Sequence, residues 1–319
     1  MLNGLRSWFY DEFKCENWGL HHPKPALYAT SQWPIPHIVF IIYRALWATW
    51  FLIWIVMCGI DWIGLIPSMR TYPDETYNSE NGPKWFIYLT HWAFTLVTVN
   101  CINQTSLAIE YYIKRRKVTS DDQLFLKMPL TYQLAWVIYN MSTCSPFIIS
   151  GLYWGFVHSV DEHWVLTGVN FHTHAVQSIY TIIDLFITAT PIRIYHMVFP
   201  LSCAIIYSGF TAAYFACGGT NIMGKNFIYP GLEWDKPGEA LYICGVLVFC
   251  FTPLLHVFVY ACHQLRIWLY HRCYGQPDYG NDDVITGEEV KEMNVVINSD
   301  ATVDKSDLTP VLTLKTAIA

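Results

Sequence analysis

The chain has 319 residues, of which 53% are hydrophobic, 17% aromatic and only 14% charged. A soluble domain carries about 25% charged residues, so this composition excludes an ordinary soluble protein and predicts an integral membrane protein. The formal net charge is -6, and the sequence has no basic patch of the kind that binds nucleic acid. A nucleic-acid-binding function is therefore excluded.

Residues 1 to 35 are predicted to form a cytoplasmic N-terminal arm. The opening sequence MLNGLRSWFYDEF lacks the apolar core and the small-residue cleavage site of a signal peptide. We therefore expect the first spanning helix itself to direct insertion into the membrane.

Six segments follow that are long and apolar enough to cross a bilayer, which takes about 20 residues of helix. They are residues 36 to 60, 85 to 109, 130 to 157, 164 to 187, 196 to 217 and 239 to 262. The link ATPIRIYH, which contains Pro191, predicts a tight turn between the fourth and fifth segments. The expected fold is all-α, a polytopic membrane bundle of six transmembrane helices within residues 36 to 265.

Lysine and arginine are unevenly distributed among the connecting segments. Most lie in the N-terminal arm, the second loop (IKRRKVTSDDQ), the fourth link and the segment after the last helix. The opposite loops carry only Arg70, Lys84, Lys225 and Lys236. Because basic loops stay in the cytoplasm, both termini are predicted to be cytoplasmic. Residues 266 to 319 are acidic and lack helical periodicity, which predicts a disordered cytoplasmic tail.

The ten cysteines form no CxxC pair and no evenly spaced framework, so most are interpreted as small hydrophobic residues. Cys58 and Cys217 lie near predicted helix ends. A disulfide between these two is the minority expectation.

Six ionisable residues lie at membrane depth in the predicted spans, away from the residues at which the spans begin: Arg44, His91, His172, His174, Asp184 and His256. Such groups are costly at membrane depth and usually face the bundle interior or a water-filled cavity. Structural interpretations also exist, since Arg44 can extend to the interface and Asp184 can pair with Arg193 or with the basic second loop. His172 and His174 are two residues apart and therefore point to different helix faces, which argues against one shared site.

Metal binding and covalent catalysis are the two chemistries that these residues suggest. A metal site is disfavoured because an HxH pair splays on a helix, no HExxH cluster is present and carboxylates are absent at the same depth. We therefore expect neither a metal nor a cofactor. Covalent catalysis needs a hydroxyl with a histidine as base, and without a GxSxG elbow that hydroxyl would come from a helix.

Helix geometry selects one hydroxyl and one histidine. With both termini cytoplasmic, the second and fourth spans both begin on the outer side, near Lys84 and Trp164. At 1.5 Å per residue, Thr90 lies roughly 9 Å and His174 roughly 15 Å from those starts. The two side chains can therefore meet in the outer half of the bilayer.

The sequence resembles the rolling stone family of multipass membrane proteins over roughly residues 30 to 265. The resemblance is carried, in order, by KWFIYLTHWAFTL, LAWVIYNMSTCSPFIISGLYWGF, VNFHTHAVQSIYTIIDLFITATPIRIYH and NFIYPGLEWDKPGEA. The family takes its name from an insect protein linked to myoblast fusion. The resemblance implies a multipass membrane protein, and it raises a role in cell-cell fusion.

More distantly, the same positions resemble the androgen-induced membrane hydrolases, which cleave fatty acid esters of hydroxy fatty acids. The resemblance implies that Thr90 is the nucleophile and His174 its catalytic partner, the same pair that helix geometry selects. Phe171 stands where the hydrolases tend to carry another histidine. The matching positions are Thr90 in YLT, Asn170 and His174 in an N-x(3)-H motif, and Tyr229, Pro230, Leu232 and Glu233 in a Y-P-x-L-E element.

Three functions are compatible with the sequence. The first is threonine-dependent hydrolysis of a long-chain lipid ester that enters from the bilayer, with Asn170 or Gln177 as a candidate oxyanion donor. The second is a non-enzymatic role in cell-cell (myoblast) fusion or adhesion, with protein partners at the loops or the C-terminal tail. A transporter or channel is third, because few charges line the spans. The plasma membrane and the endoplasmic reticulum are both expected locations.

Overall fold

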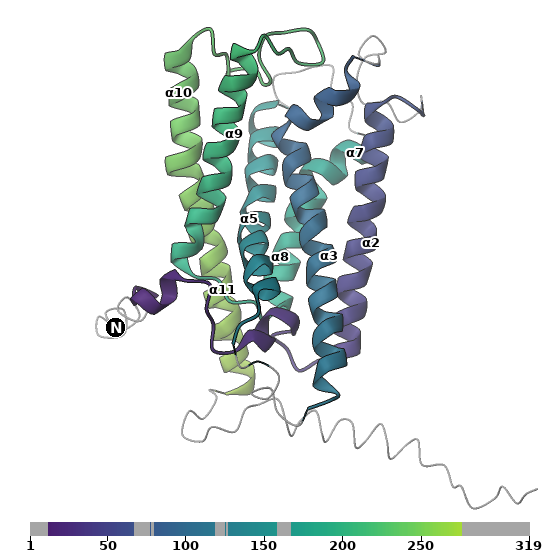
Figure 1. The fold of residues 1–319 in the computed structure, drawn as a ribbon, viewed down its shortest axis with the longest axis vertical. Helices are drawn as coiled ribbons and strands as arrows, with labels where there is room; N and C mark the ends of the chain where they lie inside the picture. Colours follow the sequence, from purple (N-terminus) through teal and green to yellow (C-terminus); the bar gives the residue numbers. More distant parts are fainter. Residues whose placement is uncertain are drawn as a thin grey trace, which may run out of the picture.

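The computed structural model describes residues 12 to 66, 77, 80 to 118, 125, 127 to 157 and 167 to 275. Within these ranges the chain is helical, with a single isolated bridge between Ser31 and Thr188. The helices stand side by side in one elongated bundle (Figure 1). The all-α prediction is confirmed. The predicted disordered tail, residues 266 to 319, is helical as far as Tyr274, and its part beyond residue 275 lies outside the described residues.

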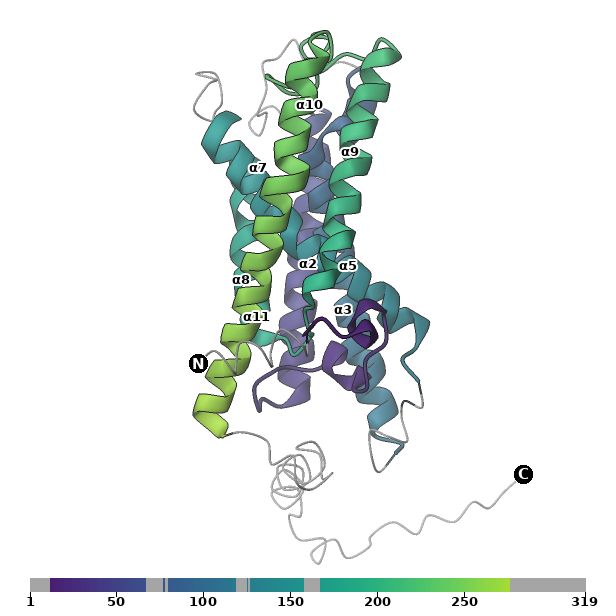
Figure 2. The ribbon, with the colours of Figure 1, turned by 90° about the vertical axis from the view of Figure 1, so that its left-hand side faces the viewer.

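A helical run occupies each of the six predicted segments. The last run continues to Tyr274, well past the predicted end at residue 262, and Figure 2 shows its parts as one long helix beside α9. The π-helical turns η6, η7 and η9 extend α5, join α7 to α8 and join α10 to α11. The α-helices are α2 (His37–Trp62), α3 (Leu89–Arg115), α5 (Leu130–Leu152), α7 (Gly168–Phe171), α8 (Gln177–Ile187), α9 (Val198–Ala216), α10 (Pro237–Val246) and α11 (Thr252–Tyr274). The 3-10 turns are η1 (Cys15–Trp18), η2 (Pro25–Ala29), η5 (Gly82–Ile87) and η8 (Ile194–Met197). The π turns are η6 (Tyr153–Val157), η7 (His172–Val176) and η9 (Leu247–Phe251).

Three of the runs in the described chain are long and apolar enough to cross a membrane by length and composition. They are His37–Trp62, Ile194–Ala216 and Pro237–Tyr274. Helix α3 is also long, but it carries buried polar side chains such as Asn100 and Gln104. The three apolar runs indicate a membrane protein.

Prolines and glycines mark the helix ends. Pro36 and Pro129 stand directly before α2 and α5, and Pro237 is the first residue of α10. Proline is tolerated there because the first helical turn does not use its missing N–H. Gly218 (φ 75°) follows α9 and Gly275 (φ 84°) follows α11, in a left-handed conformation that favours glycine.

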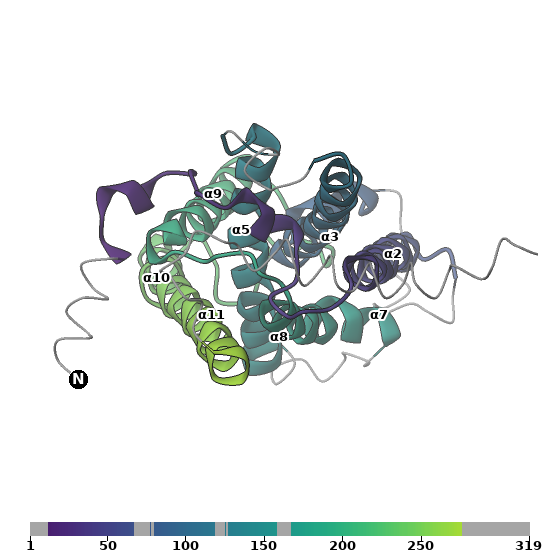
Figure 3. The same cartoon turned by 90° about the horizontal axis from the view of Figure 1, so that it is seen from below.

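Helix α5 lies in the middle of the bundle when the molecule is seen along its long axis (Figure 3). It packs against α3, α8, α9 and α11. Its central side chains Trp136, Tyr139 and Cys144 are fully buried. Helix α5 is therefore the support against which the other helices are positioned.

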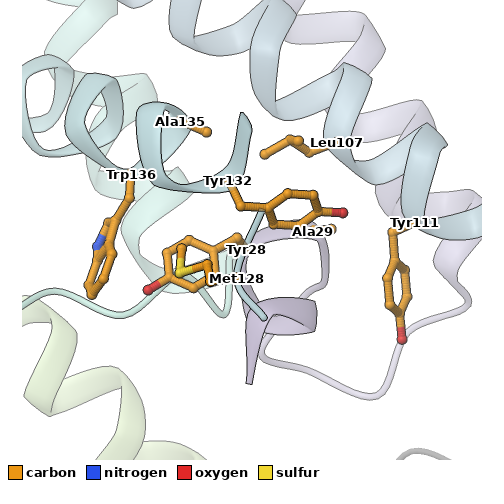
Figure 4. Close-up of a cluster of buried hydrophobic side chains, with 8 residues drawn as sticks. All are labelled: Tyr28, Ala29, Leu107, Tyr111, Met128, Tyr132, Ala135 and Trp136. Atoms are coloured by element: carbon orange, nitrogen blue, oxygen red, sulfur yellow. The ribbon is translucent and has the colours of Figure 1, made fainter. Parts of the chain in front are cut away.

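The N-terminal arm folds against one end of the bundle. Its turn η2 inserts Tyr28 and Ala29 into an apolar cluster with α3 and α5 (Figure 4). Arg193, in the link between α8 and η8, donates to the carbonyl oxygens of Asn17 and Gly19 at 3.3 and 3.1 Å. These contacts anchor the arm to the link between the fourth and fifth runs.

The expectations for Arg44 and Asp184 are wrong. Arg44 does not extend to the interface, and among the residues that the structure describes Asp184 pairs neither with Arg193 nor with the second loop. Instead Arg44 Nη1 lies 2.5 Å from Asp184 Oδ1, with side chains only 1% and 3% exposed. The hydroxyl of Tyr43 donates to the same oxygen at 3.1 Å. A carboxylate buried this deeply needs a cationic partner at the same depth, and α2 supplies one.

The cysteines are free thiols in the described chain. Cys58 is buried and Cys217 is exposed, and no disulfide joins them. The minority expectation of a bond between them is not met.

Candidate functional site

Thr90 is buried in the first turn of α3. The α-helix begins at Leu89 and follows a 3-10 turn, so Thr90 lies nearer to the helix start than the sequence predicted. Three other threonines of α3, Thr95, Thr98 and Thr105, donate their hydroxyls to the carbonyl four residues earlier. Thr90 has no helical carbonyl behind it, so its hydroxyl is available for other partners.

Two tyrosine hydroxyls meet at the start of α3. The backbone N–H of Leu89 donates to Tyr207 Oη at 3.1 Å and to Tyr229 Oη at 3.0 Å. Tyr207 itself donates to the carbonyl of Ile87 at 2.9 Å. Tyr229 also lies within hydrogen-bonding reach of the side chain and the backbone N–H of Thr90. The Y-P-x-L-E element therefore contacts the predicted nucleophile.

The loop that carries Tyr229 is fastened to the segment before α3. Lys84 Nζ donates to Thr220 Oγ1 at 3.0 Å and to the carbonyl of Asn221 at 2.9 Å. Asn81 Nδ2 donates to the carbonyl of Ile222 at 3.1 Å. These bonds hold the loop over the helix start, and burial raises the pKa of the Tyr229 phenol, so it stays protonated at neutral pH.

His174 lies in the π turn η7, and side chains from the neighbouring run bind its backbone. Ser150 Oγ donates to the carbonyl of His174 at 2.5 Å, and Trp154 Nε1 donates to it at 3.3 Å. Side-chain insertion into the backbone ladder is a recognised cause of helix distortion, and π turns are frequent at functional sites. The contacts with α5 and η6 therefore account for the local geometry around His174.

The imidazole of His174 is held by stacking rather than by a hydrogen bond to Nδ1. Its ring lies parallel to that of Tyr153, with centroids 3.6 Å apart and an interplanar angle of 8°. Nδ1 is buried and has no hydrogen-bond partner in the described part of the chain. A buried polar atom without a partner marks a position where water, a ligand or a shift of the ring would supply one.

Thr90 and His174 belong to elements that pack against each other, α3 and η7. His174 is close enough to His91, the residue after Thr90, for their charges to interact. Among the described residues, however, no hydrogen bond joins Thr90 to His174. The structure therefore brings the two side chains into one region without pairing them directly.

His172 and His174 occupy different faces, as the sequence predicted. The ring of His172 stacks on Trp54 of α2, with centroids 3.4 Å apart and an interplanar angle of 10°. Its Nδ1 lies 2.6 Å from the carbonyl of Gly168. His172 is therefore a packing residue between α2 and the fourth run.

The two predicted supporting amides have different environments. The backbone N–H of Asn170 donates to the capping hydroxyl of Thr167 at 3.1 Å, while its side chain is within hydrogen-bonding reach of Tyr153. Gln177 Nε2 donates to the carbonyl of Thr173 at 2.5 Å, and its Oε1 is buried without a partner. Asn170 thus contacts the residue that stacks on His174, whereas the Gln177 amide group bonds along its own helix.

Tyr153 and Tyr207 were missed by sequence reasoning. Nothing in the spacing of either residue indicates a contact with His174 or with the start of α3. Tyr229 was part of a recognised motif, which could have suggested its role. Over the ranges that the structure covers, no group of three or more His, Cys, Asp or Glu side chains is arranged to hold a metal ion.

The fold and these contacts define an all-α membrane protein with a buried threonine, tyrosine and histidine region near the start of α3. The chain belongs to the rolling stone family, because the family model described as Protein rolling stone matches residues 2–275. It is 29% identical over 256 residues to Protein rolling stone of Drosophila melanogaster, which covers 77% of this chain and 87% of that protein. No solved structure matches.

Proposed function

We propose that the chain is a six-span protein of the plasma membrane or endoplasmic reticulum that hydrolyses long-chain lipid esters, with a place in lipid metabolism. Six helical runs and three strongly apolar ones support the number of spans. The basic second loop and N-terminal arm support cytoplasmic termini. Fatty acid esters of hydroxy fatty acids, or similar esters, are the substrate class.

One observation carries the proposal. The hydroxyl of Thr90, unlike those of the other three α3 threonines, is not bonded to its own helix and lies within reach of Tyr229. The helix that carries it packs against the turn that carries His174. A hydroxyl without a helical partner, near a histidine with an unpaired nitrogen, is a combination that nucleophilic catalysis uses.

In the first half-reaction, Thr90 Oγ attacks the ester carbonyl carbon and His174 takes the hydroxyl proton. The tetrahedral intermediate then expels the alcohol oxygen, which receives that proton from His174. The phenol of Tyr229, which accepts from the N–H of Leu89 and reaches Thr90, would serve as a donor to the developing oxyanion. Catalytic hydrogen bonds are often long without substrate and tighten when it binds, which accommodates the separate positions of Thr90 and His174.

In the second half-reaction, water attacks the acyl-threonine carbonyl while His174 takes one of its protons. The intermediate releases the fatty acid, and the Thr90 oxygen regains its proton from His174. The sum is ester plus water giving acid plus alcohol, with the enzyme unchanged. No metal or cofactor is needed for this balance.

The test uses purified full-length protein in detergent micelles. Wild type is expected to react with a fluorophosphonate probe at Thr90, mapped by peptide mass, and to hydrolyse long-chain esters. Thr90→Ala and His174→Ala should lose both properties. Thr95→Ala is the control, because it removes a hydroxyl from the same helix that is bonded to a carbonyl. Folded wild type that neither labels nor hydrolyses any lipid ester would exclude the proposal.

A non-enzymatic role in cell-cell fusion or adhesion is the second candidate. The folded loop held by Lys84 and Asn81 favours it, because this loop offers an ordered surface for a protein partner outside the bundle. Cells that express Thr90→Ala and His174→Ala separate the two candidates. Normal fusion with both variants would support a role that does not depend on hydrolysis.

A further inference from the structure

An apolar crevice lies between α5, α9 and the π turn η9, with a cavity volume of about 30 Å³. Its wall includes Ser145 of α5, Cys203 and Ala204 of α9 and Leu247 of η9. This volume is far below the roughly 300 to 1,000 Å³ of an enclosed small-molecule site, so a ligand would lie along the crevice with one side uncovered. The crevice is therefore a narrow apolar groove along the helices rather than an enclosed pocket.

The crevice is elongated along the helices. Its wall residues on α5 run from 141 to 148 and those on α9 from 200 to 207. At 1.5 Å per residue, seven positions correspond to about 10 Å along each helix. Such a shape suits an extended hydrocarbon chain.

One end of the crevice adjoins the candidate site. Leu89 and Tyr207 line this end, and Leu89 directly precedes Thr90. The hydroxyl of Tyr207 accepts from the N–H of Leu89 and donates to the carbonyl of Ile87. The apolar walls therefore lead to a group of hydrogen-bonding atoms at the start of α3.

The walls themselves offer little to a polar group. Ser145 supplies a hydroxyl, and its buried Oγ has no hydrogen-bond partner in the described chain. The other wall side chains on α5 and η9, Met141, Ile148 and Leu247, are apolar. A head group would lose its hydration here without compensation, whereas a hydrocarbon chain gains from burial.

A second apolar groove on the molecule provides a contrast. It follows one face of α2, along Ile42, Ala45, Leu46 and Trp50. It is formed by a single helix, and none of its lining residues belongs to the region around Thr90. Ordinary bilayer lipid would cover this face, so the α2 groove serves as the matched reference.

We propose that the crevice between α5, α9 and η9 holds one hydrocarbon chain of the lipid ester and so places the ester carbonyl at Thr90. The identification of the chain as part of an ester rests on the proposed hydrolase function. Cys203 and Ala204 are small, so a chain can lie close to the backbone of α9 at these positions. A larger side chain at position 204 would shorten or close the site.

The experiment uses full-length protein in nanodiscs and a long-chain ester with a diazirine in the middle of its acyl chain. Cross-links are expected on residues 141 to 148 and 200 to 207. Ala204→Trp should reduce them at least about fivefold, whereas Ala45→Trp, at a similarly half-buried alanine on the α2 groove, should not. Cross-links concentrated on α2, or unchanged by Ala204→Trp, would overturn the proposal.

A second measurement needs no substitution. Cys203 is a free, half-buried thiol, so its alkylation can be followed by peptide mass. The ester should slow alkylation at Cys203 at least about threefold and leave alkylation at the exposed Cys217 unchanged. Equal rates with and without ester would contradict occupancy of the crevice.

Hydrolysis measured on the same samples distinguishes this inference from the proposed function. Cross-linking and Cys203 protection without ester cleavage would leave a lipid-chain site in place and exclude the hydrolase. Ester cleavage whose dependence on chain length is the same in wild type and Ala204→Trp would support the hydrolase and exclude the crevice as its chain site.

Discussion

Arg44 Nη1 donates a hydrogen bond to Asp184 Oδ1 at 2.5 Å, and this ion pair joins α2 to α8 inside the bundle. The two residues are 140 positions apart in the sequence. Removing two charges from water is costly, so such a pair adds little net stability by itself. Removing one partner of the pair lowers the free energy of unfolding, because the remaining charge would stay buried without compensation.

We predict that Asp184→Asn lowers the free energy of unfolding by about 3 to 5 kcal/mol. Thermal unfolding in detergent should show this as a clear fall in midpoint. Lys114→Ala is the control, since it breaks the exposed pair with Glu110 and should cost about 0 to 1 kcal/mol. The double variant Arg44→Met with Asp184→Leu should be more stable than Asp184→Asn. Equal effects of Asp184→Asn and Lys114→Ala would contradict the account.

Replacing Tyr229 with phenylalanine removes the hydroxyl that reaches Leu89 and Thr90 and keeps the ring. We expect ester hydrolysis to fall roughly fivefold, because a lost hydrogen bond of about 1 kcal/mol would act on the nucleophile and the oxyanion. The measurement compares kcat and KM with those of Tyr242→Phe, a ring that is 74% exposed. A normal kcat in Tyr229→Phe would show that this hydroxyl has no part in the reaction.

The two histidines of the fourth run allow a paired test. His172→Phe preserves a ring that can stack on Trp54, and His174→Phe preserves one that can stack on Tyr153. Both variants should fold normally. Only His174→Phe should lose hydrolysis, by at least about 10² in kcat, because it removes the base. Similar activities for the two variants would refute the assignment of His174.

The positions of the helical runs could be predicted from the sequence because hydropathy reports directly which segments avoid water. The start of α3 could not, since residues 85 to 87 are apolar and were predicted to belong to the span but form the end of the 3-10 turn Gly82–Ile87. The partner of Asp184 was not predictable either, because charge pairing across 140 residues leaves no local pattern. The π turn at His174 depends on donors from Ser150 and Trp154, which belong to another run.

In the candidate site, too, some residues could be predicted from the sequence and others could not. Thr90 and His174 could be selected by depth and by motif, and the structure places them on packed elements. Tyr207 could not be selected, because its role follows from the meeting of α9 with the start of α3. Contacts between elements that are distant in the sequence set this part of the site.

His22 gives the protein a pH-dependent contribution to stability. It lies in the N-terminal arm, beside Tyr28 and Trp136, with Nδ1 accepting from the N–H of Lys24 at 3.0 Å. Burial, and then the charge of Arg193, lower its pKa from 6.5 to about 4. His22 is therefore neutral in the folded protein at pH values where the unfolded chain already binds the proton.

Between about pH 6.5 and pH 4 the unfolded state binds more protons at His22 than the folded state does. The contribution of His22 to the free energy of unfolding is therefore complete above this window and is lost as the pH falls through it. We predict that His22→Gln reduces the fall in Tm between about pH 7 and about pH 5. His21→Gln, at the neighbouring exposed histidine, should leave the fall unchanged. An identical pH response in wild type and His22→Gln would contradict this prediction.

The proposed topology places residues 224 to 226 on the outer side and both termini in the cytoplasm. These three loop residues are exposed, and they lie between Asn221 and the buried Ile228, so an epitope inserted after Lys225 should be tolerated. In sealed vesicles of cytoplasmic-side-out orientation, protease should remove an epitope at either terminus and spare the loop epitope. The reason is the excess of lysine and arginine in the arm and second loop, which keeps those segments in the cytoplasm. Cleavage of the loop epitope together with either terminal one, before detergent is added, would require an even number of crossings between the loop and that terminus. The six-span arrangement has five crossings before the loop and one after it, so this result would exclude it.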